Sequence, residues 1–442
     1  MAKNKTSVFK VVLFFILILI GIGVRIIPVN NLKNGDILVH LDWSKTLYKQ
    51  HLNNIYFYPK WLYAPPSQPP LMMLAFWTSR HLYENRYLLS ELHNSIKIPP
   101  ASVILWIDKY GEFLLLRLWA ILGDILSALL VYFVIKKHQK NFKIAILGFA
   151  FMLFNPLSIF ETTFWGQNDI ISIFFTYLAF LIIKDKKISI LSPLLYLIAI
   201  LIKPTSLVFI PFYIFYYFRN INLNRHNLLR ITLSALLCLA LIYFSFKPFL
   251  NPNNSPITEI YNIVTTRITS SSKGLSRASN SAFNLYSLLF QLDKTYGSFK
   301  ILGLTLDSIG VIFYLLINAV SIFIMSKNKG QNGPTKLFFI LFFIGQGVFL
   351  FMTGMLERYF FPAFLASILL MFLNFKQFGL YMIIQNIIWL LNLIYSFYQR
   401  DVGWMRTLFE GNSNLLIRII SLISLINFIL VFKKYSATKS QY

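Results

Sequence analysis

Apolar segments of about twenty residues recur along the chain, and they restrict its fold more than any other feature. A helix that crosses a bilayer needs about 20 mainly apolar residues, because all of its backbone polar groups must be satisfied internally. Hydrophobic residues make up 57% of the 442 residues and charged residues only 13%. Soluble domains carry about 25% charged residues. The sequence therefore excludes a soluble enzyme and a disordered protein, and it predicts an all-α integral membrane protein.

We count about twelve membrane spans in one transmembrane domain that covers residues 1–442. The first, at about 8–27, follows several lysines and precedes no small-residue cleavage site, so we interpret it as a retained anchor. The segment 188–218 around Lys203 is short for two spans, and either two tilted helices or a re-entrant hairpin would fit it. The other spans are expected at about 113–135, 143–163, 169–184, 229–248, 303–326, 336–355, 359–375, 377–398 and 413–432.

The distribution of Lys and Arg orients this bundle. When the N-terminus is placed in the cytoplasm, the loops on that side hold most of the clustered basic residues and one acid, Asp185. Cytoplasmic loops of membrane proteins carry such an excess of Lys and Arg. We therefore expect both termini to be cytoplasmic. Membrane topology then explains much of the net charge of +25, and nucleic acid is not expected as a partner.

Two long loops fall on the outer side, at about 29–112 and 249–302. The first contains two apolar segments, Pro70–Trp77 and Ala101–Ile107, which are typical of juxtamembrane helices that lie in the membrane interface. The second is rich in Ser, Asn and Gly, and we expect it to form a mobile lid. Long loops in compact proteins are commonly functional or disordered.

Polar clusters gather at the outer ends of the predicted spans. Charged groups at membrane depth are costly, so each is a candidate for function. The candidates are Asp36, His40, Asp42 and Trp43 after the first span; Tyr63 and Gln68 in a proline-rich turn; Glu161, Trp165, Gln167 and Asp169; Lys203; and Glu357, Arg358 and Tyr359.

Each candidate also has a structural explanation. Asp36 or Asp42 can cap a juxtamembrane helix, and position alone favours that role for Asp42 over proton transfer. Lys203 can extend to the lipid headgroups or neutralise a phosphate. Arg358 can pair with Glu357 or bind phosphate oxygens in a bidentate manner.

One acid lies deep within a predicted span. Asp124 follows Arg117 by seven residues, which places the two on one helix face about 10 Å apart. An ionised Asp124 needs a partner at this depth. It can pair with Arg117, contact another helix or stay protonated.

Familiar motifs for metal, nucleotide and hydrolytic chemistry do not occur. The chain has no H-E-x-x-H, Walker loop, Gly-rich dinucleotide fingerprint, G-x-S-x-G elbow or Asp-x-Asp pair, and its single cysteine is Cys238. We therefore expect no metal and no cofactor.

Taken together, the clusters resemble bacterial members of the GT-C superfamily, multi-pass glycosyltransferases that use polyprenyl-phosphate sugars, in the mannosyltransferase-like branch. The resemblance spans about residues 36 to 362. It is carried by Asp42-Trp43, Tyr63 to Leu71, Asn155-Pro156, Trp165 to Asp169, Lys203-Pro204, Ser279 to Tyr286 with Asn284 among them, and Glu357-Arg358-Tyr359.

The resemblance implies transfer of a hexose such as mannose from a polyprenyl-phosphate donor to a hydroxyl of a glycan, lipid or protein. The reaction would take place at the outer face of a bacterial plasma membrane and invert the anomeric configuration. The catalytic carboxylate would be Asp42, with Asp36 as the second candidate. Lys203 and Arg358 would lie near the lipid phosphate. The chain departs from many relatives at Leu356, where they carry His.

Two other functions stay open. A flippase or transporter of a lipid-linked saccharide would use a similar bundle, but the chain shows no matched half-repeats, and its polar clusters lie at the outer face rather than at mid-membrane. A glycan polymerase or ligase would use a lipid-linked oligosaccharide donor, and the sequence does not separate it from a transferase of single sugars.

Overall fold

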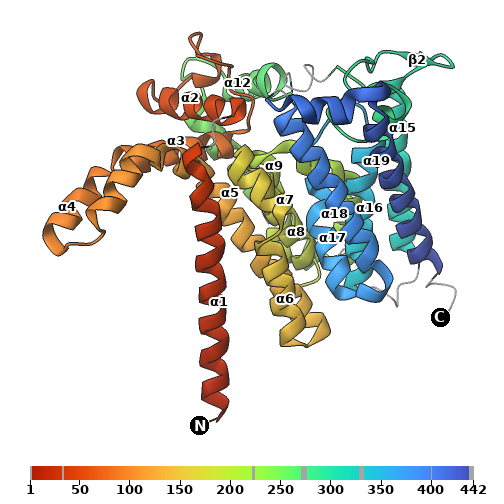
Figure 1. The fold of residues 1–442 in the computed structure, drawn as a ribbon, viewed down its shortest axis with the longest axis horizontal. Helices are drawn as coiled ribbons and strands as arrows, with labels where there is room; N and C mark the ends of the chain where they lie inside the picture. Colours follow the sequence, from red (N-terminus) through yellow and green to blue (C-terminus); the bar gives the residue numbers. More distant parts are fainter. Residues whose placement is uncertain are drawn as a thin grey trace.

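The protein is a bundle of helices with very little sheet. The computed structural model describes residues 2–31, 34–221, 224–269, 276–327, 333–399 and 401–437. Both ends of the chain lie at one end of the bundle, here called the lower end (Figure 1). The opposite, upper end carries α2 (Gly35–Lys49), α12 (Pro256–Ile263) and the short strand β2 (Lys300–Ile301).

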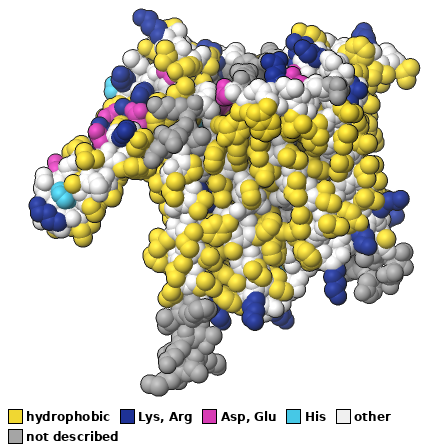
Figure 2. Space-filling model, in the orientation of Figure 1, with side chains coloured by type: hydrophobic (Ala, Val, Ile, Leu, Met, Phe, Trp, Pro, Cys, Tyr) yellow, Lys and Arg dark blue, Asp and Glu magenta, His cyan; other side chains and the backbone are white. Residues whose placement is uncertain are grey.

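The prediction of an all-α membrane protein is confirmed. Among the described residues, eight helices are long and apolar enough to cross a membrane, and three shorter apolar helices accompany them. Twelve full-length spans are therefore not established. On the face in Figure 2, apolar side chains form a broad band across the bundle, and the Asp and Glu side chains gather toward the upper end. The eight long segments are 10–29, 101–139, 142–165, 227–249, 306–326, 334–351, 375–398 and 413–437.

The remaining elements follow in chain order. In the first half they are α1 (Ala2–Ile26), η1 (Ile27–Asn31), η2 (Ile55–Phe57), α3 (Pro70–Glu84), α4 (Tyr87–Ile96), α5 (Ala101–Gln139), α6 (Phe142–Leu153), α7 (Pro156–Ile159), η3 (Phe160–Trp165), α8 (Asp169–Ile182), η4 (Ser189–Leu191), α9 (Ser192–Ile202), η5 (Pro204–Phe209) and α10 (Ile210–Asn220). In the second half they are α11 (Arg225–Phe246), η6 (Lys247–Phe249), η7 (Val264–Ile268), β1 (Ser279–Asn280), α14 (Leu285–Leu289), β3 (Leu304–Thr305), α15 (Leu306–Ser326), α16 (Pro334–Phe351), β4 (Met355–Leu356), α17 (Phe361–Leu373), α18 (Phe375–Tyr398) and α19 (Gly403–Ala437).

Prolines mark where the membrane helices break. Pro156 begins α7 after Asn155, whose side chain caps the new helix, and a π-helical turn, η3, follows. Pro204 begins η5 after Lys203, whose backbone is extended. Proline lacks an N–H and disfavours helix at the preceding residue. The segment 188–218 therefore folds as α9 and the η5–α10 unit, joined at Lys203.

The first outer loop is mostly helical, with one correction to the sequence-based expectation. Helix α3 begins at Pro70 as predicted, but Ala101–Ile107 is not a separate interfacial helix. It forms the first turns of the continuous helix α5. The polar residues that interrupt the apolar run do not end the helix, since Lys and Glu are good helix formers, and Asp108 pairs with Arg86 across a 2.6 Å contact. Helix α4 projects from the side of the bundle (Figure 1).

The second outer loop packs onto the bundle through a short parallel strand pair. Strand β1 pairs with β4, with Ser279 opposite Met355 and Asn280 opposite Leu356. Strands β2 and β3 form an antiparallel hairpin. Residues 270–275 of the predicted lid lie outside the described residues.

The main core lies where α16 and α17 meet α18. Trp389 is fully buried and stacks on Phe360, with ring centroids 4.6 Å apart. A Cβ at Gly345 would lie 2.6 Å from the backbone nitrogen of Ala363, so this glycine allows α16 and α17 to approach closely. The first span differs, since only 11% of its most apolar window is buried.

A buried ion pair attaches α1 to the bundle. Arg25 Nε lies 2.8 Å from Asp124 Oδ2, and both side chains are fully buried. Thr162 donates to the same carboxylate at 2.9 Å, and Ser158 donates to its other oxygen. Of the three fates open to Asp124, contact with another helix is the one observed. Arg117 is not its partner but donates to the carbonyl of Thr163 at 2.7 Å.

Asp124→Leu is expected to lower the free energy of unfolding by about 3–5 kcal/mol, because it leaves Arg25 charged and buried without its counterion. The double variant Arg25→Met/Asp124→Leu removes both charges and should recover most of this loss. Unfolding of all three proteins in one detergent measures the effect. A double variant as unstable as the sum of the two single variants would contradict this explanation.

Candidate active site

The start of α2 is attached to the end of the π-helical turn η3. Asn34 caps α2, because its side-chain oxygen accepts the backbone N–H of Ile37 at 2.9 Å. The Asn34 amide nitrogen donates to the carbonyls of Phe164 and Trp165 at 3.0 and 2.8 Å. Neither Asp36 nor Asp42 is therefore the cap, and the Asp36 carboxylate remains available for other contacts.

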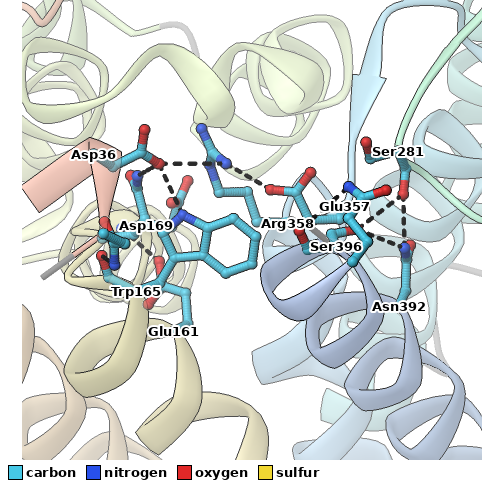
Figure 3. Close-up of polar contacts among 12 residues, drawn as sticks. Asp36, Glu161, Trp165, Asp169, Ser281, Glu357, Arg358, Asn392 and Ser396 are labelled. Atoms are coloured by element: carbon cyan, nitrogen blue, oxygen red, sulfur yellow. Dashed lines mark hydrogen bonds and ion pairs between the residues drawn. The ribbon is translucent and has the colours of Figure 1, made fainter. Parts of the chain in front are cut away.

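Asp36 is the centre of a polar cluster at the upper end (Figure 3). Its Oδ2 accepts hydrogen bonds from Trp165 Nε1 at 2.8 Å and from Gln167 Nε2 at 2.7 Å. Arg358 Nη1 lies 3.8 Å from the same oxygen. Burial opposes ionisation, but Arg358, His40 and the two hydrogen bonds outweigh it and hold the pKa of Asp36 below its usual value. Asp36 is therefore a carboxylate at neutral pH.

Arg358 joins Asp36 to a second acid. It donates to Glu357 Oε1 at 2.6 Å, and its guanidinium lies 5.6 Å from the centre of the Trp165 ring. The strand pair β1–β4 ends at Leu356 and so positions both residues. Burial raises the pKa of Glu357, and Arg358 opposes that shift. Arg358 Nε is shielded from solvent and has no acceptor among the described residues.

Gln167 connects Asp36 to Lys203. Its amide nitrogen donates to Asp36, and its amide oxygen accepts a hydrogen bond from Lys203 Nζ at 3.0 Å. Lys203 also forms an ion pair with Asp169 Oδ2. Lys203 is 7% exposed, so it points into the protein rather than toward the headgroups.

Two buried acids lie beneath this ammonium group. Glu161 Oε1 accepts the backbone N–H of Asp169 at 3.3 Å, and both side chains are fully buried. Glu161 Oε2 and Asp169 Oδ1 have no hydrogen-bond partner among the described residues. The polar cluster thus continues from Asp36 into the interior (Figure 3).

Other predicted site residues make contacts elsewhere. Asp42 Oδ2 accepts the backbone N–H groups of Leu62 and Tyr63 at 2.9 and 3.3 Å, so Asp42 holds the proline-rich turn. The Tyr63 side chain is exposed. Trp43 Nε1 donates to the Ala64 carbonyl at 2.7 Å.

Three more predictions fall in structural positions. The Gln68 backbone carbonyl accepts the Tyr56 hydroxyl at 2.8 Å. Asn284 caps α14 together with Ser287. Tyr359 is half-buried next to Arg358, and burial raises its pKa.

The structure thus brings Asp36, Trp165, Gln167, Asp169, Lys203, Glu357 and Arg358 into one connected cluster, with Glu161 below it. Sequence reasoning missed Asn34, although an Asn directly before Gly35 and an apolar helix is a typical N-cap pattern. It also missed Arg25, because a single Arg at the end of an apolar run gives no indication of its partner.

The cluster has the chemistry of a proton acceptor next to cations. An ionised carboxylate lies against a guanidinium, and both are held by hydrogen bonds from rigid elements. Within the described residues, no group of three or more His, Cys, Asp or Glu side chains is arranged to hold a metal ion. No protein-family model and no curated protein matches the sequence, so the resemblance to GT-C enzymes remains a prediction.

Gly166→Ala is expected to destabilise the protein by at least about 1–2 kcal/mol, since an L-residue is strained at its φ of 76°. The new Cβ would also lie 2.8 Å from Ile37 Cδ1, at the contact between η3 and α2. Thermal unfolding measures the loss. Gly35→Ala is the matched control, because a Cβ there meets no atom within 4 Å; an equal loss in both variants would contradict the explanation.

His40 is expected to make stability fall as the pH drops below 6.5. It is buried and stacks on Phe76 at 4.6 Å. Burial lowers its pKa from 6.5 to about 4; Asp36 opposes this shift, and nearby cations, Lys203 first, add to it. Between those two values the unfolded chain binds a proton that the folded protein excludes, so acid favours unfolding.

The measurement is the unfolding temperature of wild type and of His40→Phe at pH 7 and pH 5. Wild type should lose more stability between the two values than the variant, which has no imidazole to protonate. Parallel losses in both proteins would mean that His40 does not contribute.

Proposed function

We propose that this protein is a membrane glycosyltransferase of the GT-C type that transfers a sugar from a polyprenyl-phosphate donor to an acceptor hydroxyl. A hexose such as mannose is the proposed sugar, and a glycan, lipid or protein is the proposed acceptor. The observation that supports this most directly is the ionised Asp36 carboxylate, held 3.8 Å from Arg358 at the upper end of an apolar bundle. A donor in the membrane would present its phosphate and its reactive carbon at this depth.

In this proposal Asp36 is the general base. The acceptor oxygen attacks the anomeric carbon and its proton passes to Asp36, while the bond to phosphate breaks and the lipid phosphate leaves with the electron pair. Attack from the opposite face inverts the configuration. A carboxylate with a lowered pKa is a weak base, but transfer through an oxocarbenium-like transition state requires little help with deprotonation before the bond breaks. Position therefore matters more than basicity.

Arg358 is the proposed partner of the leaving phosphate. Its Nε has no acceptor among the described residues, and a guanidinium binds phosphate oxygens through two parallel hydrogen bonds. Negative charge develops on the phosphate as the bond breaks, so a fixed cation favours the transition state. Lys203 is already bonded to Gln167 and Asp169, and we assign it a positioning role through Gln167 rather than direct phosphate contact.

The geometry favours Asp36 over Asp42, the first choice from the resemblance. Both backbone N–H groups that Asp42 binds belong to the 62–63 turn, which supports a structural role. Asp36 instead contacts three side chains from two other segments, Trp165 and Gln167 at the end of η3 and Arg358 after β4. We further propose that the upper end faces the outside of a bacterial plasma membrane and that both termini are cytoplasmic, in agreement with the Lys and Arg distribution.

Asp36→Asn is expected to reduce sugar transfer by about 10²–10⁴-fold, because an amide cannot accept the proton. The assay supplies purified protein in lipid with a panel of polyprenyl-phosphate sugars and measures transfer or release of labelled sugar. It requires that the variant unfold at nearly the wild-type temperature, since Asn keeps the shape and can still accept from Trp165.

Asp42→Asn is the matched control, with the same chemical change six residues along the same helix. It should retain most of the transfer activity. If Asp42→Asn abolishes transfer and Asp36→Asn does not, Asp42 is the base after all. If wild type transfers no sugar from any donor, the enzyme proposal itself fails.

One observation favours the transporter alternative. From the partly exposed Asp36, polar groups continue through the buried Gln167, Lys203 and Asp169 to Glu161, so the cluster reaches into the interior as a transport path would. A flippase would move a lipid-linked saccharide between leaflets without breaking a glycosidic bond. Fluorescent lipid-linked saccharides in proteoliposomes distinguish the two functions, and product size distinguishes a polymerase or ligase from a single-sugar transferase.

A further inference from the structure

A groove lies on the outside of the bundle, between the ends of α10 and α15. It is open to the surroundings, has a volume of about 450 Å³ and is lined by Ile214, Phe215, Phe218, Arg219 and Ser326. Ser326 is the last residue of α15, which is followed by the basic segment that begins at Lys327. The groove lies at the end of the η5–α10 unit that is remote from Lys203, and nothing in the proposed reaction uses it.

The apolar wall of the groove faces away from the protein. Phe212, Tyr213, Tyr216 and Tyr217 on the other side of α10 are buried in the core. Ile214 and Phe218, one helical turn apart, are about half exposed, at 50% and 49%. In a bundle surrounded by lipid, such a stripe contacts acyl chains rather than water.

Cationic groups lie at one end of this apolar wall. The Arg219 guanidinium lies 5.8 Å from the Phe215 ring, and its Nη2 is shielded with no acceptor among the described residues. Lys184 is close enough that, after burial, the Arg219 charge lowers its pKa. The acid next to Lys184 in sequence, Asp185, accepts the backbone N–H of Lys187 at 2.8 Å. Among the residues that line the groove, Arg219 is the charged one.

We propose that this groove binds an anionic phospholipid, with one acyl chain along Ile214 and Phe218 and the headgroup phosphate on Arg219. The lipid comes from the leaflet on the side of the chain termini. The volume suits part of a lipid, since ligand sites commonly enclose about 300–1,000 Å³. This inference does not rest on the proposed glycosyltransferase activity.

The chemistry selects an anionic lipid over a zwitterionic one. A guanidinium offers phosphate two parallel donors, and the buried Nη2 gains the acceptor that it lacks in the protein alone. A phosphatidylcholine headgroup also carries phosphate, but its quaternary ammonium is repelled by the Arg219 guanidinium that lines the groove. Basic clusters at the membrane surface attract anionic lipids for the same reason.

The test measures thermal unfolding and native mass spectra of purified protein in a neutral detergent as phosphatidylglycerol is added. The same measurements are repeated with phosphatidylcholine, which is zwitterionic, and with glycerol phosphate, which is anionic but has no acyl chain. We expect phosphatidylglycerol alone to raise the unfolding temperature and to remain bound. Arg219→Gln should weaken this binding by about tenfold or more, the usual effect of losing hydrogen bonds to a charged group.

Arg230→Gln is the matched control. Arg230 is another arginine, eleven residues after Arg219, but it donates to the Lys187 carbonyl at 3.0 Å. Its replacement by Gln changes the net charge by the same amount. Binding in this variant should stay within about twofold of wild type. A second variant, Ser326→Trp, fills the groove from an exposed position without touching the charge and should also weaken binding.

Three results would overturn the proposal. Equal binding by wild type and Arg219→Gln would remove the phosphate contact. Equal protection by phosphatidylcholine would remove the selection for anionic lipid. Protection by glycerol phosphate to the same extent would indicate a site for free phosphate, with no role for the apolar wall. If Arg219→Gln does not fold, an unchanged affinity in Ser326→Trp is by itself enough to reject the groove.

Discussion

The structure depends on matching each charge that is buried among apolar helices. The ion pair between Arg25 and Asp124 illustrates the constraint, because either charge alone would be costly at this depth. It also has a positional consequence. Helix α1 has little buried surface of its own, so this contact fixes where α1 ends. The chain then has only a short path through η1 to Asn34, which attaches α2 to the end of η3.

The Asp36 cluster is assembled from segments that are remote in sequence. One follows the first span, one ends the π-helical turn, one is the break between α9 and η5, and one follows strand β4. Each of these four segments lies where a helix begins, ends or is interrupted. At such places side chains from neighbouring elements can converge at the end of the bundle. The short β1–β4 pair interrupts the chain just before Arg358, and the turn at Gly166 ends η3 just after Trp165.

The sequence was sufficient for the fold class and for most members of the cluster. Apolar runs predicted the helices, and the cost of charge at membrane depth selected Asp169, Lys203 and Arg358. Trp165 and Gln167 were selected as neighbours of Asp169 in the same outer cluster. The sequence did not predict which of these side chains contact each other. Asp36 and Asp42 lie six residues apart on one helix and point in different directions, and only the neighbours decide which one meets Arg358. The partner of Asp124 is likewise distant in sequence, since Arg25 lies 99 residues before it.

The bridge made by Gln167 joins two charged groups through a side chain that is itself neutral. A side-chain amide has no ionisable proton, and here its nitrogen is used by Asp36 and its oxygen by Lys203. Gln167 therefore holds Asp36 and Lys203 in a fixed relation without itself taking up or releasing a proton. A change of side chain at this one position would disturb the carboxylate and the ammonium group at the same time.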